Sequence, residues 1–139
     1  MKFAKSVTTL AVALGAAGAC LATTGTAAAA SWDHVWTSTD ANPGATVYIR
    51  EYGDVVRICD TDADGYYAYV GYNYKGSDGI PVGNGLSASG NGNCNQQGAS
   101  TSAIDNIPEN ENVTVTVGLG KSGQAGLKFS ATHTFLNDH

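Results

Sequence analysis

The stretch that decides the fold is Asn-Val-Thr-Val-Thr-Val-Gly-Leu, residues 112–119, in which every second residue is apolar. Side chains alternate between the two faces of a β-strand, so this pattern places valine and leucine in a core and threonine in solvent. A helix would need apolar residues three and four positions apart, and no window of the chain sustains that spacing. We therefore predict a strand here and an all-β fold around it.

The same alternation recurs on both sides of this stretch. Towards the C-terminus, after a glycine-rich turn at 120–126, the residues that share the predicted inner side are Leu127, Phe129, Ala131, His133 and Phe135. Towards the N-terminus, residues 66–75 place a second set on the predicted core side, namely Tyr66, Ala68, Val70, Tyr72 and Tyr74. Both stretches are predicted strands.

Two shorter strands are predicted at residues 45–51 and 55–60, and the link Tyr52-Gly53-Asp54 makes them a hairpin. Residues 76–99 contain seven glycines, four asparagines and three serines, and they are predicted to form a long loop. Residues 100–107 are a further candidate strand. Short strands joined by glycine-rich turns predict an antiparallel β-sandwich or small barrel of about 5–7 strands.

The first 30 residues have the order of a secretory signal peptide. Two lysines precede an apolar run over residues 7–22, and four alanines at 27–30 offer a site for signal peptidase. Cleavage there predicts a secreted, extracellular chain with a single β domain over residues 31–139. The apolar run is short and diluted for a membrane anchor. Lipidation at Cys20 is an alternative, because small residues precede this cysteine.

Residues 31–139 are acidic, with five Lys or Arg against 12 Asp or Glu and a net charge of −7. A nucleic-acid-binding surface needs clustered basic side chains, so the composition argues against that class of protein. We expect no membrane partner after cleavage, no required cofactor and a monomeric state. An extracellular protein and a carbohydrate both stay open as partners.

Two cysteines, Cys59 and Cys94, follow the signal peptide. In an exported domain of this size, two thiols are expected to form one structural disulfide. The bridge would tie the glycine-rich segment at 76–99 to the strand at 55–60.

The segment Asp60-Thr61-Asp62-Ala63-Asp64-Gly65 matches the first half of a calcium-binding loop. Oxygen ligands at positions 1, 3 and 5 followed by glycine at position 6 are the pattern of such a loop. Position 12 is Gly71, however, where a bidentate glutamate is needed. The segment is therefore either a turn between two strands or a structural calcium site formed by Asp60, Asp62 and Asp64.

Catalytic patterns are sparse. The histidines are His34, His133 and His139, and no Gly-x-Ser-x-Gly elbow occurs after residue 30. His133 lies on the predicted inner side of its strand, which is typical of a structural histidine. We therefore predict a non-catalytic protein, with a small hydrolytic enzyme as the least favoured alternative.

Aromatic residues give the best indication of a binding surface. Trp32, His34 and Trp36 would share one face of an extended N-terminal segment, and Tyr67 and Tyr69 lie on the predicted outer face of their strand. Exposed aromatic rings on a rigid sheet are suited to recognise a protein or a sugar. The alternative is that the tryptophans cover the core and that the tyrosines pack under the glycine-rich segment.

The signal peptide and the segment at residues 45–75, in which Cys59-Asp60 is followed by Ala63-Asp64-Gly65, resemble small secreted β proteins of actinobacteria. Most of that group have no assigned activity, so the resemblance implies secretion and a β fold but no catalytic residue. A more distant similarity is to the secreted α-amylase inhibitors of actinomycetes. Their Trp-Arg-Tyr inhibitory segment has no match here, and one disulfide replaces two. The predicted function is a secreted binding or interaction module, with an inhibitor of an extracellular hydrolase as the alternative.

Overall fold

The computed structural model of the chain describes residues 31–101 and 105–139. The predicted signal peptide, its cleavage after Ala30 and lipidation at Cys20 lie outside these residues. The described chain contains eight strands: β1 (His34–Thr37), β2 (Ala45–Arg50), β3 (Val55–Asp60), β4 (Tyr67–Lys75), β5 (Pro81–Ser89), β6 (Cys94–Gln97), β7 (Glu111–Gly120) and β8 (Lys128–Asn137).

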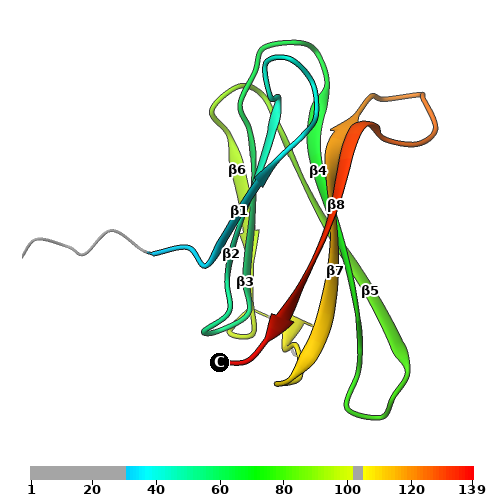
Figure 1. The fold of residues 1–139 in the computed structure, drawn as a ribbon. Coiled ribbons are helices and arrows are strands. Elements are labelled where there is room, and N and C mark those ends of the chain that lie inside the picture. Colours follow the sequence, from blue (N-terminus) through cyan, green and yellow to red (C-terminus); the bar gives the residue numbers. More distant parts are fainter. Residues whose placement is uncertain (1–30, 102–104) are drawn as a thin grey trace, which may run out of the picture.

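The strands form two antiparallel sheets, with orders β1-β2-β3-β6 and β5-β4-β7-β8. Figure 1 shows the two sheets facing each other. At one edge of the sandwich, rings of β1 contact rings of β8, and at the other edge β5 contacts β6. The predicted all-β, antiparallel sandwich is confirmed. The hairpin predicted around Tyr52-Gly53-Asp54 is also confirmed, because β2 and β3 pair from Arg50↔Val55 to Ala45↔Asp60.

The core lies between the sheets and uses the predicted side of each strand. The alternation at residues 112–119 is confirmed, since Val113, Val115, Val117 and Leu119 are buried. The core side of β4 is confirmed as well, with Tyr66 at its margin. From the first sheet, the inward residues are Ala45, Val47, Ile49, Val56 and Ile58.

The prediction of a loop at residues 76–99 is wrong, because this segment contains β5 and β6 and brings the strand count to eight. Apolar and polar residues alternate only weakly in β5. Val82, Leu86 and Ala88 contact the core, while the residues between them are glycine, asparagine and serine. Strand β6 has no apolar residue after Cys94 and pairs with β3.

Two further predictions differ from the structure. Of residues 100–107, the described ones form no strand. Phe129, predicted to face inward, is 50% exposed because the β7–β8 register shifts between Val117 and Leu119 and Phe129 adopts a left-handed φ of 51°. Such a bulge turns a side chain away from its expected face. The Phe129 carbonyl accepts a hydrogen bond from the Thr39 amide at 2.8 Å, next to the β1 edge.

The predicted disulfide between Cys59 and Cys94 is confirmed, and the two residues are direct partners in the β3–β6 pairing. No described residue belongs to a helix long and apolar enough to cross a bilayer.

Candidate functional site

The outward face of the β5-β4-β7-β8 sheet is the best candidate for a binding surface. The predicted outer residues Tyr67 and Tyr69 are in β4, in the middle of this sheet, and both are half-buried. Their inward neighbours Ala68 and Val70 are completely buried in the core. Since successive residues of a strand point to opposite faces, both tyrosines lie on the outer face.

Glycines beneath the rings let both tyrosines lie close to the sheet. A Cβ on Gly120 would overlap the ring of Tyr67, its direct partner across the β4–β7 pairing. A Cβ on Gly85 would overlap the hydroxyl of Tyr69, and one on Gly71 would lie 3.3 Å from the same ring. The rings therefore cover backbone that has no side chain of its own, which is the arrangement by which aromatic residues compensate for glycine in sheets.

Small neutral side chains make up much of the rest of this face, and Leu136 and Lys75 lie towards its ends. In β7 and β8, cross-strand threonine pairs bring the hydroxyls of Thr116 and Thr132 to 3.0 Å and those of Thr114 and Thr134 to 3.4 Å. On the other side of β4, the outer positions of β5 are glycine and serine. The result is a broad surface of hydroxyl groups around two aromatic rings.

Beside Tyr69 the face is hollowed to a volume of about 420 Å³. The hollow is open because Gly71, Gly83 and Gly85 line it without side chains, and Asn73 provides an exposed amide at its margin. An aromatic wall next to an amide group is a suitable arrangement for a ligand that has both an apolar face and hydroxyl groups.

Buried and half-buried polar residues support this hollow from below. Tyr72, which is 1% exposed, donates a hydrogen bond of 3.1 Å to Asp105. The amide groups of Asn84 and Gln97 donate to the same Asp105 oxygen at 2.5 and 2.9 Å. Burial raises the pKa of the Tyr72 hydroxyl, so this group stays a hydrogen-bond donor at all physiological pH values.

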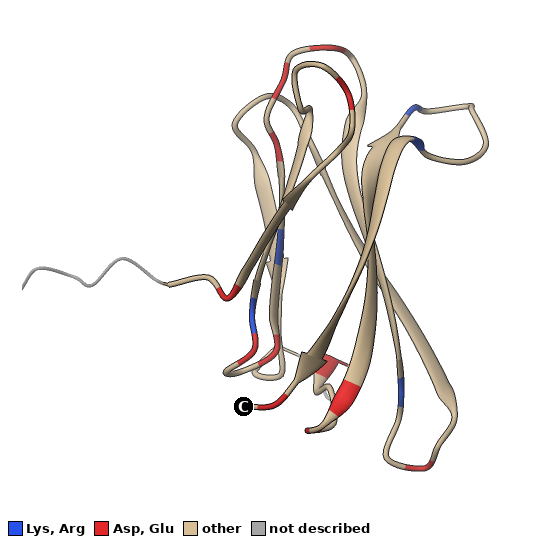
Figure 2. Cartoon of the chain, in the orientation of Figure 1, with Lys and Arg blue, Asp and Glu red and all other residues tan. Residues whose placement is uncertain are grey.

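The charge of the protein lies elsewhere. Figure 2 shows Asp and Glu at the two ends of the molecule and in the loops, while the middle of β4, β5, β7 and β8 is tan, the colour of the other residues. Lys75 stands at the end of β4. The protein as a whole is acidic, but the centre of this face is uncharged. Because interacting surfaces have complementary charge, this indicates an uncharged ligand.

The two predicted tryptophans do not join this face. Trp36 packs at the sandwich edge, where its ring stacks on His133 at 4.6 Å and on His34 at 5.0 Å. Trp32 contacts Tyr48 on the outer side of the other sheet, at a ring distance of 5.5 Å. The expectation that Trp32 shares a face with Trp36 is therefore wrong, because Trp32 precedes β1 and does not follow its alternation.

Trp32 and Tyr48 border a second hollow of about 390 Å³, together with Arg57 and the disulfide. This hollow carries a cation and a single aromatic pair, whereas the β5-β4-β7-β8 face is wide and neutral. The two surfaces lie on opposite sides of the sandwich, so one extended ligand cannot contact all four predicted aromatic residues.

The carboxylates predicted as calcium ligands accept hydrogen bonds from backbone amides in and near the turn. Asp60 is 2% exposed and accepts a hydrogen bond from the Gly90 amide at 2.7 Å. Asp62 and Asp64 accept from the amides of Ala63 and Tyr66, each at 2.8 Å. The three carboxylates are not a group whose oxygens lie within 4.8 Å of one another. A calcium site here stays a prediction.

A second polar cluster, at the other end of the molecule, was not predicted. Nε2 of His34 lies 2.7 Å from Oε1 of Glu51, and Nδ1 of His139 lies 3.3 Å from Oε2 of Glu51 and 2.9 Å from Oδ1 of Asp138. Burial would raise the pKa of Glu51, but hydrogen bonds from the Asp138 amide and from both rings outweigh it and hold the pKa below its ordinary value. The hydrogen bond to Glu51 raises the pKa of His139. These residues are too far apart in the sequence to form a local motif.

Comparison with protein-family models, with curated proteins and with solved structures finds no match. The resemblance to secreted actinobacterial proteins therefore stays a prediction, and the function has to be inferred from the geometry of the molecule itself.

Proposed function

We propose that this protein is a secreted, non-catalytic binding module whose β5-β4-β7-β8 face holds a neutral polysaccharide. The observation that carries the proposal is the placement of Tyr67 and Tyr69 against glycines in the middle of a sheet face whose central residues are uncharged. The resemblance to actinobacterial exports and the leader support the extracellular location, and the disulfide is the type of bond that persists there.

A polysaccharide suits this face better than a protein does. Sugar rings offer a flat side of C–H groups that packs on an aromatic ring, and hydroxyls at their edges that bond to side chains such as Asn73 and the threonine pairs. Protein interfaces place aromatic and arginine anchors in a desolvated centre, and this face has no arginine and no deep pocket. Its width also favours an extended chain of sugars over a single one.

Replacing Tyr67 and Tyr69 by alanine is expected to weaken binding to insoluble polysaccharides by about tenfold or more, because each ring is a central contact of the face. The measurement is a depletion assay with cellulose, chitin and an insoluble glucan. Tyr52→Ala is the matched control, since Tyr52 is 78% exposed in the β2–β3 turn. Equal binding by both variants, or no binding by the wild type to any neutral polysaccharide, would contradict the proposal.

Gly120→Ala tests the same face without removing a ring. The new methyl group would displace Tyr67 from the backbone that it covers, so binding is expected to fall while the fold is retained. Circular dichroism of this variant checks the fold. A folded Gly120→Ala protein that binds like the wild type would show that the position of the Tyr67 ring against Gly120 does not matter.

An inhibitor of an extracellular hydrolase is a second candidate function, favoured by the β4–β5 hairpin. Figure 1 shows this hairpin extending past the neighbouring strands, and Ile80 at its tip is 60% exposed. Such a tip is suited to enter the active-site cleft of an enzyme. If this is its function, micromolar protein reduces the activity of an amylase or a protease and Ile80→Asp abolishes the effect. Unchanged activity across a hydrolase panel excludes this candidate.

A further inference from the structure

The cluster of Glu51, Asp138 and His139 joins the two sheets at the end of the molecule opposite the Asp60–Asp64 turn. Glu51 directly follows β2, while Asp138 and His139 directly follow β8, the last strand of the other sheet. One ligand atom from each of these residues lies within 4.8 Å of the others, and among residues 31–101 and 105–139 no other group of three such side chains does so.

The spacing of these atoms suits a single small cation. Ligands about 2.1 Å from a tetrahedral ion lie about 3.4 Å from one another. The Nδ1 atom of His139 is 3.3 Å from the Glu51 oxygen and 2.9 Å from the Asp138 oxygen.

A single nitrogen of His139 has to serve both carboxylates of the cluster. Two carboxylates approach the same nitrogen of His139, and that nitrogen carries at most one proton. The carboxylates also repel each other at this distance, and Glu51 is buried, which strengthens the repulsion. A divalent ion at the point where the three atoms converge would neutralise both carboxylates and use the nitrogen lone pair.

The surroundings of Glu51 resemble the outer shell of a metal site. Its Oε2 atom is the one that faces His139, while Oε1 is held by Nε2 of His34 at 2.7 Å. The Asp138 amide also points to Oε2 at 3.3 Å. Partners that hold the second oxygen of a carboxylate fix the direction of the first, as they do for metal ligands in general.

We propose that Glu51, Asp138 and His139 bind a divalent transition-metal ion, with His34 as the outer-shell partner of Glu51. An imidazole with two carboxylates is a ligand set for Zn²⁺, whereas Ca²⁺ takes oxygen ligands alone. Water would complete the coordination. The ion would link the β2–β3 turn to the end of β8 and so stabilise the sandwich across its two sheets.

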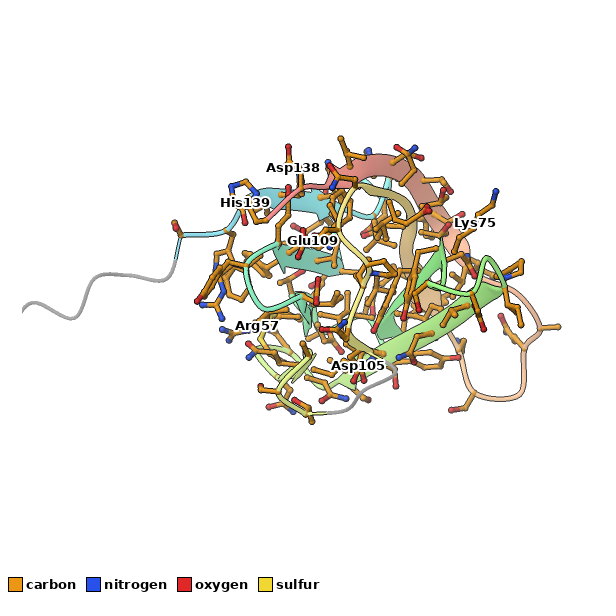
Figure 3. The ribbon with its side chains drawn as sticks, turned by 90° about the horizontal axis from the view of Figure 1, so that it is seen from below. Arg57, Lys75, Asp105, Glu109, Asp138 and His139 are labelled. Carbon is orange, nitrogen blue, oxygen red and sulfur yellow. A yellow bond between two sulfur atoms is a disulfide. The ribbon has the colours of Figure 1, made fainter. Side chains whose placement is uncertain are left out.

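An ion can reach the cluster from solvent, and the local charge favours it. The His139 and Asp138 side chains are 61% and 52% exposed. Figure 3, which views the molecule from below, places both residues at the rim on the opposite side from Lys75. Figure 2 shows further Asp and Glu at this end, around the C-terminus. A concentration of negative charge attracts cations over several ångströms at low salt.

Isothermal titration of the tag-free protein with ZnCl₂ tests the proposal, together with melting curves in Zn²⁺ and in EDTA. We expect one equivalent of Zn²⁺ to bind and the melting temperature to rise. His34→Gln is expected to lower the affinity by about 10–100-fold, because it removes only the outer-shell bond. His139→Ala is expected to lower it further. His139 is mostly exposed, so its loss leaves the fold intact even where Glu51→Gln does not.

Glu109→Gln is the matched control, because Figure 3 shows Glu109 at the same end of the molecule and the change removes the same charge as Glu51→Gln or Asp138→Asn. It is expected to bind Zn²⁺ as the wild type does. Absence of Zn²⁺ binding by the wild type would overturn the proposal. Equal binding by wild type and His139→Ala would also overturn it, since the ion would then be held elsewhere.

Discussion

Replacing Cys59 and Cys94 together by alanine is expected to lower the free energy of unfolding by roughly 3–4 kcal/mol. The disulfide joins residues 35 positions apart, and a cross-link over a loop of that length removes about this much conformational entropy from the unfolded chain. For a domain of about 100 residues, the loss corresponds to a fall of about 10–20 °C in melting temperature. Urea unfolding followed by tryptophan fluorescence measures it.

The disulfide also has a local role, because it holds an edge strand that has little else. Strand β6 is four residues long, three of them exposed, and its pairing partner is β3. A reductant should therefore destabilise the wild type by the same amount as the double substitution and should leave the double variant unchanged. A loss below about 1 kcal/mol would mean that the unfolded chain is already compact around this loop.

Most of the fold could be predicted because the buried residues of a half-buried strand alternate with exposed ones, and this alternation is visible in the sequence. Val113, Val115 and Val117 occupy the core and the threonines between them lie outside. The same rule identifies the inner side of β4. It works wherever the inward residues are large and the outward residues are polar, since the contrast is then visible without knowledge of the partner strand.

Strands β5 and β6 were not predicted because most of their residues are glycine, serine, asparagine or glutamine, so neither strand shows a strong contrast between apolar and polar positions. The glycines of β5 make sense only beside β4, where Gly85 lies under Tyr69. That relation depends on the pairing of two strands and therefore cannot be read from β5 alone. Phe129 shows the reverse case, in which a bulge breaks an alternation that is visible in the sequence.

The residues of the candidate sites also fall into two groups, those that could be placed from the sequence and those that could not. Tyr67 and Tyr69 could be assigned to an outer face, because both are in a well-patterned strand. Trp32 could not be placed, since it stands before the first strand and packs on Tyr48 by tertiary contact. Glu51 is 87 and 88 positions away from Asp138 and His139, and only the closure of the sandwich brings them together.

Asp105→Ala is expected to cost roughly 2–4 kcal/mol of stability, the second large effect. Asp105 is 4% exposed and accepts hydrogen bonds from Tyr72, Asn84 and Gln97, which belong to three different strands. Without its carboxylate, the buried Tyr72 hydroxyl and the part-buried amides of Asn84 and Gln97 lose this acceptor. Each unsatisfied buried group costs about 1–3 kcal/mol unless water replaces the partner. Thermal and urea unfolding both measure the loss.

Two variants show whether the loss comes from the hydrogen bonds. Asp105→Asn keeps an acceptor oxygen and is expected to lose less stability than Asp105→Ala, while Glu109→Ala, an exposed carboxylate, is expected to stay within about 0.5 kcal/mol of the wild type. Tyr72→Phe combined with Asp105→Ala should cost less than the sum of the two single changes, because phenylalanine leaves no hydroxyl to be satisfied. Additive losses would mean that Asp105 stabilises the sandwich by packing rather than by accepting these bonds.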